Sequence, residues 1–380
     1  MSTETIDVKK AIDEKALDNK CPGCGAPIFF NPKLNKWKCA YCNSEYTLKE
    51  MQKFNNASNE KYNGDTKEEK VEKEEVKKNR LPKEKDHTVY ISHKCKNCGA
   101  EIVADEQTSA TFCVYCGSTA ILQSKLSGEF QPELIIPFKT EKEQAIQAFV
   151  NLKKGRPFVP KDFTSQENIE KIKGVYIPFW LYDIFVSGSV NCDGKRITSW
   201  TRGDTRYTKT DTYAINRTGE MLFTKVPVDG STRFANDIMN SIEPFYYEDI
   251  QEYNHAYLSG FYAEKFDVTS EDAFEDAKNR SLNSGKDIMY NDSRGYNTKI
   301  VVENSLSAKK ENSRYALLPV WMVNVNYKDK MYIFAMNGQT GKFIGDIPLD
   351  KKKAWIWGIL IFIGLFLGVA IISLFIHFMG

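Results

Sequence analysis

The chain has 380 residues, of which 52 are lysine or arginine and 50 are aspartate or glutamate, and its net charge is +2. Two or three domains and at least one sizeable core fit this length. The charge is balanced, so bulk charge gives no hint of a nucleic-acid partner. Residues 1–20 form a polar segment with one short helix predicted at 8–17, and they lack the apolar stretch of a signal peptide.

Eight of the nine cysteines occur as four CxxC pairs, arranged in two sets that have the same spacing. Four thiolates in this pattern are typical of a closed tetrahedral structural zinc site, which leaves no position for a catalytic water. A redox role would not explain why the pairs come in matched fours. We therefore predict two structural Zn²⁺ sites. The ligands of the first are Cys21, Cys24, Cys39 and Cys42, and those of the second are Cys95, Cys98, Cys113 and Cys116.

The residue after the second cysteine of each pair supports this prediction. A metal knuckle needs a positive φ at that position, which glycine and asparagine adopt most easily. Those residues are Gly25, Asn43, Gly99 and Gly117.

Each cysteine set encloses a predicted short hairpin, formed by residues 27–30 with 36–38 and by residues 101–104 with 109–112. Such small units bury too little apolar surface to fold alone, so bound metal would supply much of their stability. Trp37 precedes the third ligand of its set and could stack on nucleic-acid bases. We favour the interpretation that it forms the core of the small unit, and Phe112 in the second set has the same two interpretations.

Composition and spacing divide the chain into six parts. These are a polar segment at 1–20, a first cysteine unit at 21–54, a charged linker at 55–90, a second cysteine unit at 91–126, a soluble α+β body at 127–350 and a transmembrane helix at 354–378. The linker alternates lysine and glutamate, so it forms either an exposed helix with i,i+4 ion pairs or no fixed structure.

The body begins with a predicted strand at 131–138 and a helix at 140–152, with Thr140 as the N-cap and Glu143 completing a capping box. A strand follows at 175–189, and an antiparallel meander with Gly-Asp and Thr-Gly turns at 190–228. Residues 266–277 again predict a strand end, a Thr or Ser cap and a helix.

Two short sequences in the body resemble one another. Residues 177–180 read Ile-Pro-Phe-Trp, and residues 318–321 read Leu-Pro-Val-Trp. We therefore predict that the body consists of two related units, each with a helix packed on an antiparallel sheet. The last predicted hairpin turns at Asn337-Gly338.

Catalytic motifs are absent from the sequence. The body lacks the GxSxG, Walker A and dinucleotide-binding patterns. Neither Cys192 nor His255 has a partner at a suitable spacing, so we predict no catalytic residue and no enzymatic activity. The carboxylates are scattered, but acid–base pairs can assemble from distant positions, so an unrecognised enzyme stays open as a further alternative. The basic run at 195–233 is interpreted as a solvated sheet face or as a surface for anionic lipid headgroups.

Residues 354–378 contain no Asp, Glu, Lys or Arg. A helix needs about 20 mainly apolar residues to cross a bilayer, so we predict a transmembrane helix rather than a buried core helix. Three lysines at 351–353 precede it, and the positive-inside rule keeps them and the N-terminal bulk in the cytoplasm. We therefore expect a single-pass, tail-anchored protein of the cell membrane. Gly364 and Gly368 have the GxxxG spacing that allows two helices to associate.

Residues 21–46 and 95–121, through their eight cysteines, resemble the zinc ribbons of transcription factor TFIIB and many other proteins. The whole order of parts resembles a family of bacterial TFIIB-type zinc-ribbon membrane proteins. That resemblance implies a place beside phage-shock-type and SPFH proteins in envelope-stress responses. Two functions remain open. The favoured one is a non-enzymatic membrane adaptor that recruits cytoplasmic proteins, and the alternative is a membrane-tethered nucleic-acid-binding protein.

Overall fold

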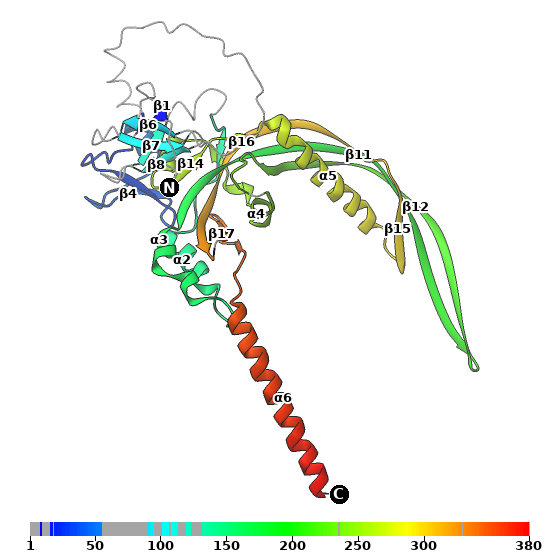
Figure 1. Ribbon diagram of the computed structural model, residues 1–380. Coiled ribbons are helices and arrows are strands. Elements are labelled where there is room, and N and C mark those ends of the chain that lie inside the picture. Colours follow the sequence, from blue (N-terminus) through cyan, green and yellow to red (C-terminus); the bar gives the residue numbers. More distant parts are fainter. Residues whose placement is uncertain are drawn as a thin grey trace. The chain divides into compact units, whose positions relative to one another are not determined.

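The computed structural model describes residues 8–9, 16–17, 19–54, 90–94, 101–105, 108–112, 119–122, 131–234, 236–328 and 330–379. The chain divides into two compact units, each built from several segments. Unit 1 comprises residues 1–137, 176–236 and 246–319, and unit 2 comprises residues 138–175, 237–245 and 320–380. Figure 1 labels their helices and strands.

Most short strands belong to unit 1. They are β1 (Val8–Lys9), β2 (Ala16–Leu17), β3 (Ile28–Asn31), β4 (Lys36–Cys39), β5 (Glu45–Tyr46), β6 (Tyr90–Lys94), β7 (Glu101–Asp105), β8 (Thr108–Phe112), β9 (Thr119–Leu122), β10 (Leu134–Ile135), β13 (Gln251–Glu252), β14 (Tyr262–Glu264) and β15 (Thr298–Asn304). The two described ends of the helix predicted at 8–17 are strands instead, because β1 pairs with β6 and β2 with β9.

The longest elements of unit 1 form an arm. Strand β11 (Lys173–Arg202) pairs antiparallel with β12 (Thr205–Asp229), and the hairpin turns at Gly203-Asp204. The predicted meander at 190–228 is therefore wrong in detail, because one long hairpin replaces several short strands. Helix α5 (Ser270–Asp292) lies along this hairpin in Figure 1, and β15 pairs with β11 beside it.

Small residues let helix α5 approach the arm closely. Its buried face consists of Ser270, Ala273, Ala277, Ser281, Gly285 and Met289. A Cβ atom at Gly285 would lie only 3.2 Å from Met221 and 3.3 Å from Val186, so glycine permits the contact. The helix and the hairpin together bury Tyr182, Ile184 and Val186.

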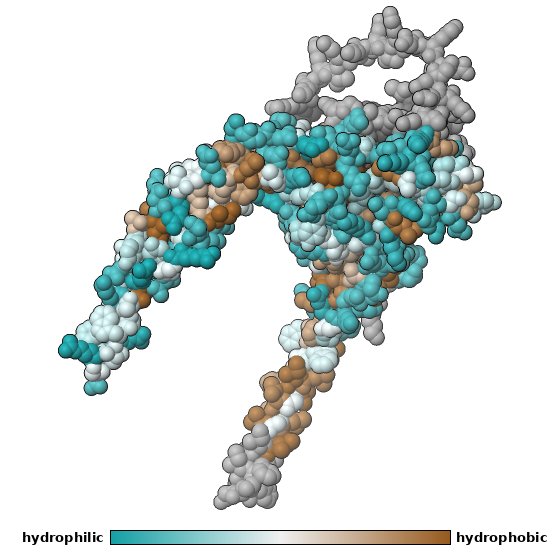
Figure 2. Space-filling model, turned by 180° about the vertical axis from the view of Figure 1, so that it is seen from behind, coloured by the Kyte–Doolittle hydropathy of each residue, from teal (hydrophilic) through white to brown (hydrophobic). Residues whose placement is uncertain are grey.

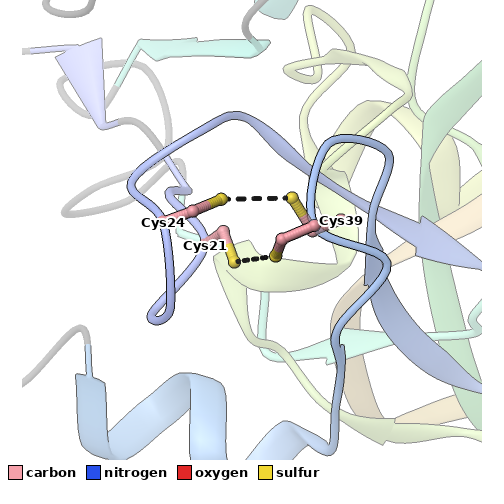
Figure 3. Close-up of side chains that lie close together, drawn as sticks. Cys21, Cys24 and Cys39 are labelled. Atoms are coloured by element: carbon pink, nitrogen blue, oxygen red, sulfur yellow. Dashed lines mark hydrogen bonds between the residues drawn. The ribbon is translucent and has the colours of Figure 1, made fainter.

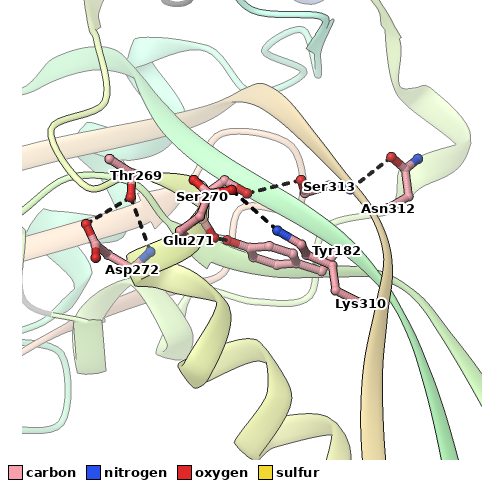
Figure 4. A network of polar contacts seen from close by, with 8 residues as sticks. All are labelled: Tyr182, Thr269, Ser270, Glu271, Asp272, Lys310, Asn312 and Ser313. Atoms are coloured by element: carbon pink, nitrogen blue, oxygen red, sulfur yellow. Dashed lines mark hydrogen bonds and ion pairs between the residues drawn. The ribbon is translucent and has the colours of Figure 1, made fainter.

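The start of helix α5 is held by a polar network (Figure 4). Of the Thr and Ser caps that the sequence leaves open, Thr269 is the N-cap, and its hydroxyl oxygen accepts a hydrogen bond from the Asp272 amide. Tyr182 donates to the Ser270 carbonyl at 2.6 Å, and the hydroxyls of Ser270 and Ser313 lie 3.0 Å apart. These bonds satisfy donors and acceptors at the buried end of the helix.

The described part of unit 2 contains helices, two whole strands and the last part of a longer strand. These elements are α2 (Lys142–Asn151), the 3₁₀ turn η3 (Lys161–Thr164), α3 (Gln166–Glu170), α4 (Asn236–Ser241), the last part of β16 (Ser307–Tyr327), β17 (Lys330–Asn337), β18 (Phe343–Gly345) and α6 (Lys351–Met379). The aromatic core includes Phe149, Phe163 and Phe334, whose rings contact one another.

Helix α2 begins later than the sequence predicts. Its N-cap is Glu141, whose backbone amide donates to Gln144 at 2.8 Å, so the predicted capping box of Thr140 and Glu143 is wrong. The Thr140 hydroxyl is already used, since it donates to the Gly338 carbonyl and accepts from the Trp321 indole. Because its hydroxyl makes these tertiary hydrogen bonds, the Thr140 side chain does not cap the helix.

The largest sheet has the strand order β13-β10-β16-β11-β14-β8-β9-β2, with β12 and β15 on β11 and β17 on β16. The predicted hairpin of 101–104 with 109–112 is not formed. Instead β7 pairs with β6, whereas β8 belongs to the largest sheet and pairs with β9 and β14. The predicted strand at 131–138 is reduced to the two residues of β10.

Helix α6 contains the predicted membrane-spanning residues. Its residues 351–369 have a mean hydropathy of 1.7 and none of them is buried, so this helix is long and apolar enough to cross a membrane. It forms the brown rod of Figure 2. Asp350 caps its start by accepting a hydrogen bond from the Lys353 amide, which lowers the pKa of the Asp350 carboxyl.

Candidate metal centre

Four cysteine side chains of unit 1 converge on one point (Figure 3). The sulfur atoms of Cys21 and Cys42 lie 3.6 Å apart, as do those of Cys24 and Cys39. All four lie within 4.8 Å of one another. A tetrahedral zinc site with bonds of about 2.3 Å would have sulfur–sulfur edges near 3.8 Å, so the cluster fits a metal ion of that size.

Two matching backbone turns bring the sulfurs together. In the first, the Gly25 amide donates to the Cys21 carbonyl at 2.9 Å, and in the second the Asn43 amide donates to the Cys39 carbonyl at 3.0 Å. Both turn residues have the predicted positive φ, 74° at Gly25 and 58° at Asn43. The positions Gly99 and Gly117, and the four cysteines 95, 98, 113 and 116, lie outside the described residues.

The thiols of the cluster differ in proton affinity. Hydrogen bonds to the hydroxyl and the backbone amide of Ser44 lower the pKa of Cys42 to about 6. The Ala26 amide lowers the pKa of Cys24, but burial and the other three thiols outweigh it and raise that pKa to about 12. Neighbouring thiolates repel one another, so they do not all ionise together. A divalent cation at their centre would remove this repulsion and bind all four as thiolates.

The cysteine cluster adjoins a small three-stranded sheet. Strand β3 pairs with β4 and β4 with β5, so the first predicted hairpin is confirmed. Trp37 of β4 is only 1 % exposed and packs on Phe30 of β3, with ring centroids 5.0 Å apart. The favoured interpretation of Trp37 as core is therefore confirmed, and its ring has no free face on which a base could stack.

This small sheet is docked on the 3₁₀ turn η5 (His255–Leu258) of unit 1. The Trp37 indole donates to the Ala256 carbonyl at 2.8 Å, and its ring lies 5.1 Å from that of Tyr257. The Phe30 amide donates to the Ser259 carbonyl at 3.0 Å. The sequence of this small sheet gave no sign of the docking, because its partners lie more than 200 residues further along the chain.

Among the described residues, the surroundings of Cys192 and His255, the two other candidate groups from the sequence, do not form a catalytic site. Cys192 is 3 % exposed and packs with Val190, Ile215 and Met289, so it is a plain buried thiol. Burial lowers the pKa of His255, which favours its neutral form. An open surface hollow of about 440 Å³ contains the ion pair of Glu133 and Arg314, but neither histidine nor cysteine lines it.

Fold and cluster together define a sheet-rich protein with a four-cysteine site that can hold a metal ion and one helix apolar enough to cross a membrane. The chain is 33 % identical to the uncharacterized protein YdjG of Bacillus subtilis (strain 168) over 335 aligned residues, which cover 75 % of this chain and 98 % of that relative. The chain therefore belongs to the YdjG family. No protein-family model matches it, and no solved structure was found that matches it.

Proposed function

We propose that this protein is a non-enzymatic membrane adaptor, whose α6 helix anchors it and whose cysteine ribbons and α+β body recruit cytoplasmic proteins. The closed geometry of the cysteine cluster carries the proposal. Four thiolates fill a tetrahedral coordination shell, and the aromatic residues beneath it are buried in unit 1. Such a metal stabilises a surface and leaves no open position for a substrate.

Zinc is the metal that we assign to this site. Four soft thiolates in a tetrahedral arrangement select zinc among the common divalent ions. The second set of cysteines has the same spacing, so we propose a second structural Zn²⁺ there. The partners implied by the zinc-ribbon resemblance, phage-shock-type and SPFH proteins, are part of the proposal.

Helix α6 supports the anchoring part of the proposal. Its apolar side chains are exposed, which in water would be costly and in a bilayer is favourable. With the lysines at 351–353 inside, the bulk of the chain faces the cytoplasm of a single-pass cell-membrane protein. Carbonate extraction and protease treatment of inverted membrane vesicles test this topology, and release of the full chain by carbonate would contradict it.

Replacement of one ligand tests the metal and the adaptor role together. Cys39→Ser should lower the zinc content by one ion per chain and unfold the ribbon, because structural zinc binding supplies about 10–16 kcal/mol in small ribbon units. Metal analysis and affinity purification of the full chain from detergent-solubilised membranes are the measurements. Cys192→Ser is the matched control, since that thiol lies outside the cluster.

We expect one set of cytoplasmic proteins to be recovered with the wild-type chain and with Cys192→Ser, and to be lost with Cys39→Ser. An unchanged zinc content in Cys39→Ser would contradict the metal assignment. Tight binding of DNA or RNA that weakens steeply with salt would instead favour the nucleic-acid alternative.

We also propose that two α6 helices associate through Gly364 and Gly368. Among the described residues, and leaving aside the neighbouring backbone of the helix itself, nothing lies within 4 Å of a Cβ built at either glycine, so a second helix can approach there. Gly364→Leu should reduce cross-linking of the full chain in membranes, and unchanged cross-linking would refute the association.

A further inference from the structure

The far end of the β11–β12 hairpin lacks the support that the rest of the arm has. Strand β15 pairs with β11 only as far as Lys195, and helix α5 ends at Asp292. Beyond this point the hairpin has two strands, in which Arg196 pairs with Asp211 and the last pair is Arg202 with Thr205. We call residues 196–211 the arm tip. Residues 196–210 are all exposed to solvent.

The arm tip presents partly exposed aromatic rings. Trp200 and Tyr207 stack across the hairpin with centroids 5.7 Å apart and an interplanar angle of 13°. Even so, Trp200 remains 48 % exposed, Tyr207 43 % and Ile197 42 %. An isolated two-stranded hairpin is only marginally stable in water. We therefore expect a binding partner outside the chain to contact the exposed tip.

Basic residues lie close to these rings in the sequence of the arm tip. The arm tip has a net charge of +2, equal to that of the whole chain, from Arg196, Arg202, Arg206 and Lys209 against Asp204 and Asp211. Lys209 and Asp211 form an ion pair at 3.1 Å. Arg196 packs over the rings of Tyr213 and Tyr296 at the base of the tip. Within the part of the chain that the structure describes, Arg202 and Arg206 form no ion pair, so both are available to an anionic ligand.

Exposed Trp and Tyr flanked by arginine suit the headgroup region of a bilayer. The amphipathic rings of Trp and Tyr prefer that layer, and anionic headgroups attract each nearby Lys or Arg. Nucleic acid demands a denser basic surface. On the face that Figure 2 shows, the end of the arm is mostly teal and white, the colours of polar and intermediate hydropathy. Such a surface is typical of an interfacial contact rather than an inserted one.

We propose that the arm tip binds the headgroup region of an anionic bilayer and gives the protein a second membrane contact besides α6. The proposal rests on the proposed anchoring, because α6 keeps the arm beside a bilayer. Tethering raises the effective concentration of the tip at the surface, so a contact that would be weak for a free protein becomes populated.

Hydrogen exchange of the full chain in nanodiscs tests this binding. One set of discs contains phosphatidylcholine alone, and the other contains phosphatidylcholine mixed with phosphatidylglycerol. We expect amides of the arm tip to exchange about tenfold more slowly in the anionic discs, and this protection to disappear at high salt. Amides of α6 should be protected in both.

Two double variants identify the groups responsible. Arg202→Glu with Arg206→Glu should abolish the protection of the tip, and Trp200→Ser with Tyr207→Ser should weaken it. The charge-matched control is Lys49→Glu with Lys53→Glu, two exposed lysines of the cysteine ribbon, which should leave the protection unchanged.

Four other results of the exchange experiment would overturn the tip proposal. Equal exchange of the tip in both kinds of disc, with α6 protected, would overturn the tip proposal and leave the anchoring intact. Unprotected α6 would overturn the anchoring, and the tip proposal with it. Protection that depends on protein concentration would assign the tip to a second copy of the chain, and protection by added RNA or DNA would assign it to nucleic acid. Either result would overturn the lipid assignment.

Discussion

The two units contain the same small arrangement around a tryptophan. In unit 1 the Trp180 indole donates to the Val268 carbonyl, and its ring lies 4.9 Å from Phe266, just before α5. In unit 2 the Trp321 indole donates to the Thr140 hydroxyl, with its ring 5.0 Å from Phe138, just before α2. In each, the tryptophan therefore fixes the start of a helix against a strand.

The correspondence extends to the ends of the two hairpins. Two amides before α5 donate to the Gly230 carbonyl, and two before α2 donate to the Gly338 carbonyl. The preceding residues, Asp229 and Asn337, each accept a bond from the amide two residues later. The two tryptophan sequences thus make equivalent contacts in the two units.

The two units differ in the elements that extend from the tryptophan arrangement. In unit 1 the β11–β12 hairpin continues to the arm tip. The β16–β17 hairpin of unit 2 is short, because its pairing begins at Val320 with Asn337 and ends at Tyr327 with Lys330. The chain of unit 2 then continues into α6. The shared contacts therefore define the core of each unit, and the extensions carry the surfaces that we propose to meet the membrane. Substitutions at equivalent positions can break or sharpen this comparison.

Removal of each tryptophan should have the largest effect. Trp321 is 6 % exposed, so Trp321→Ala should cost unit 2 about 3–5 kcal/mol, the usual range for a buried tryptophan. Trp180 is half-buried, so Trp180→Ala should cost unit 1 less. Native-state hydrogen exchange reports the two units separately. Equal losses in both units would contradict this ranking.

An acid at Asn337 should be the next most harmful change. The buried Asn337 amide group donates to the carbonyls of Ile242 and Pro244 at 3.0 and 3.1 Å. Asn337→Asp would remove both donors and place a carboxylate beside two carbonyl oxygens, at a cost of about 3 kcal/mol or more. Denaturant unfolding at pH 8 would measure it, and a loss below 1 kcal/mol would show that the surroundings adapt.

The reverse substitution in unit 1 should stabilise. Burial raises the pKa of Asp229 to about 6, and the nearby acids Asp267 and Asp276 add to this. Unfolded Asp titrates near 3.9, so the native state binds more protons between about pH 4 and 6, and its stability falls as the pH rises through that window. Above about pH 6 the native state bears the full free-energy cost of burying the ionised Asp229 carboxyl.

Asp229→Asn removes this titration and should gain about 1–2 kcal/mol at pH 8 and nothing at pH 4, after allowance for partial solvent screening. Thermal unfolding at the two pH values is the measurement. A gain that is the same at both would mean that the carboxyl is not the cause.

The smallest effect is expected at the arm tip. Trp200→Ala should change the stability of the chain in detergent by less than about 0.5 kcal/mol, because the side chain is exposed and outside both cores. The same substitution is costly at Trp321, so this pair separates core from extension. A loss above 1 kcal/mol in detergent would show that the tip supports the fold of unit 1.

Local sequence by itself determined the features that depend on chemistry over a few residues. The CxxC spacing and the residues Gly25 and Asn43 specify the two turns of the cysteine cluster, since thiol spacing and a positive φ are local properties. The Thr269 cap and the long apolar run of α6 are equally local.

Only the tertiary structure decided which partners distant segments meet. Thr140 is a good N-cap in isolation, but Trp321 and Gly338 occupy its hydroxyl, so α2 begins after Glu141. The sequence pattern also did not predict the length of the arm. Its β-branched, polar and glycine residues fit a meander as well as a single hairpin, and the packing of α5 and β15 decides between the two. Contacts across 100 to 200 residues have no periodicity along the chain, and so the sequence pattern cannot contain them.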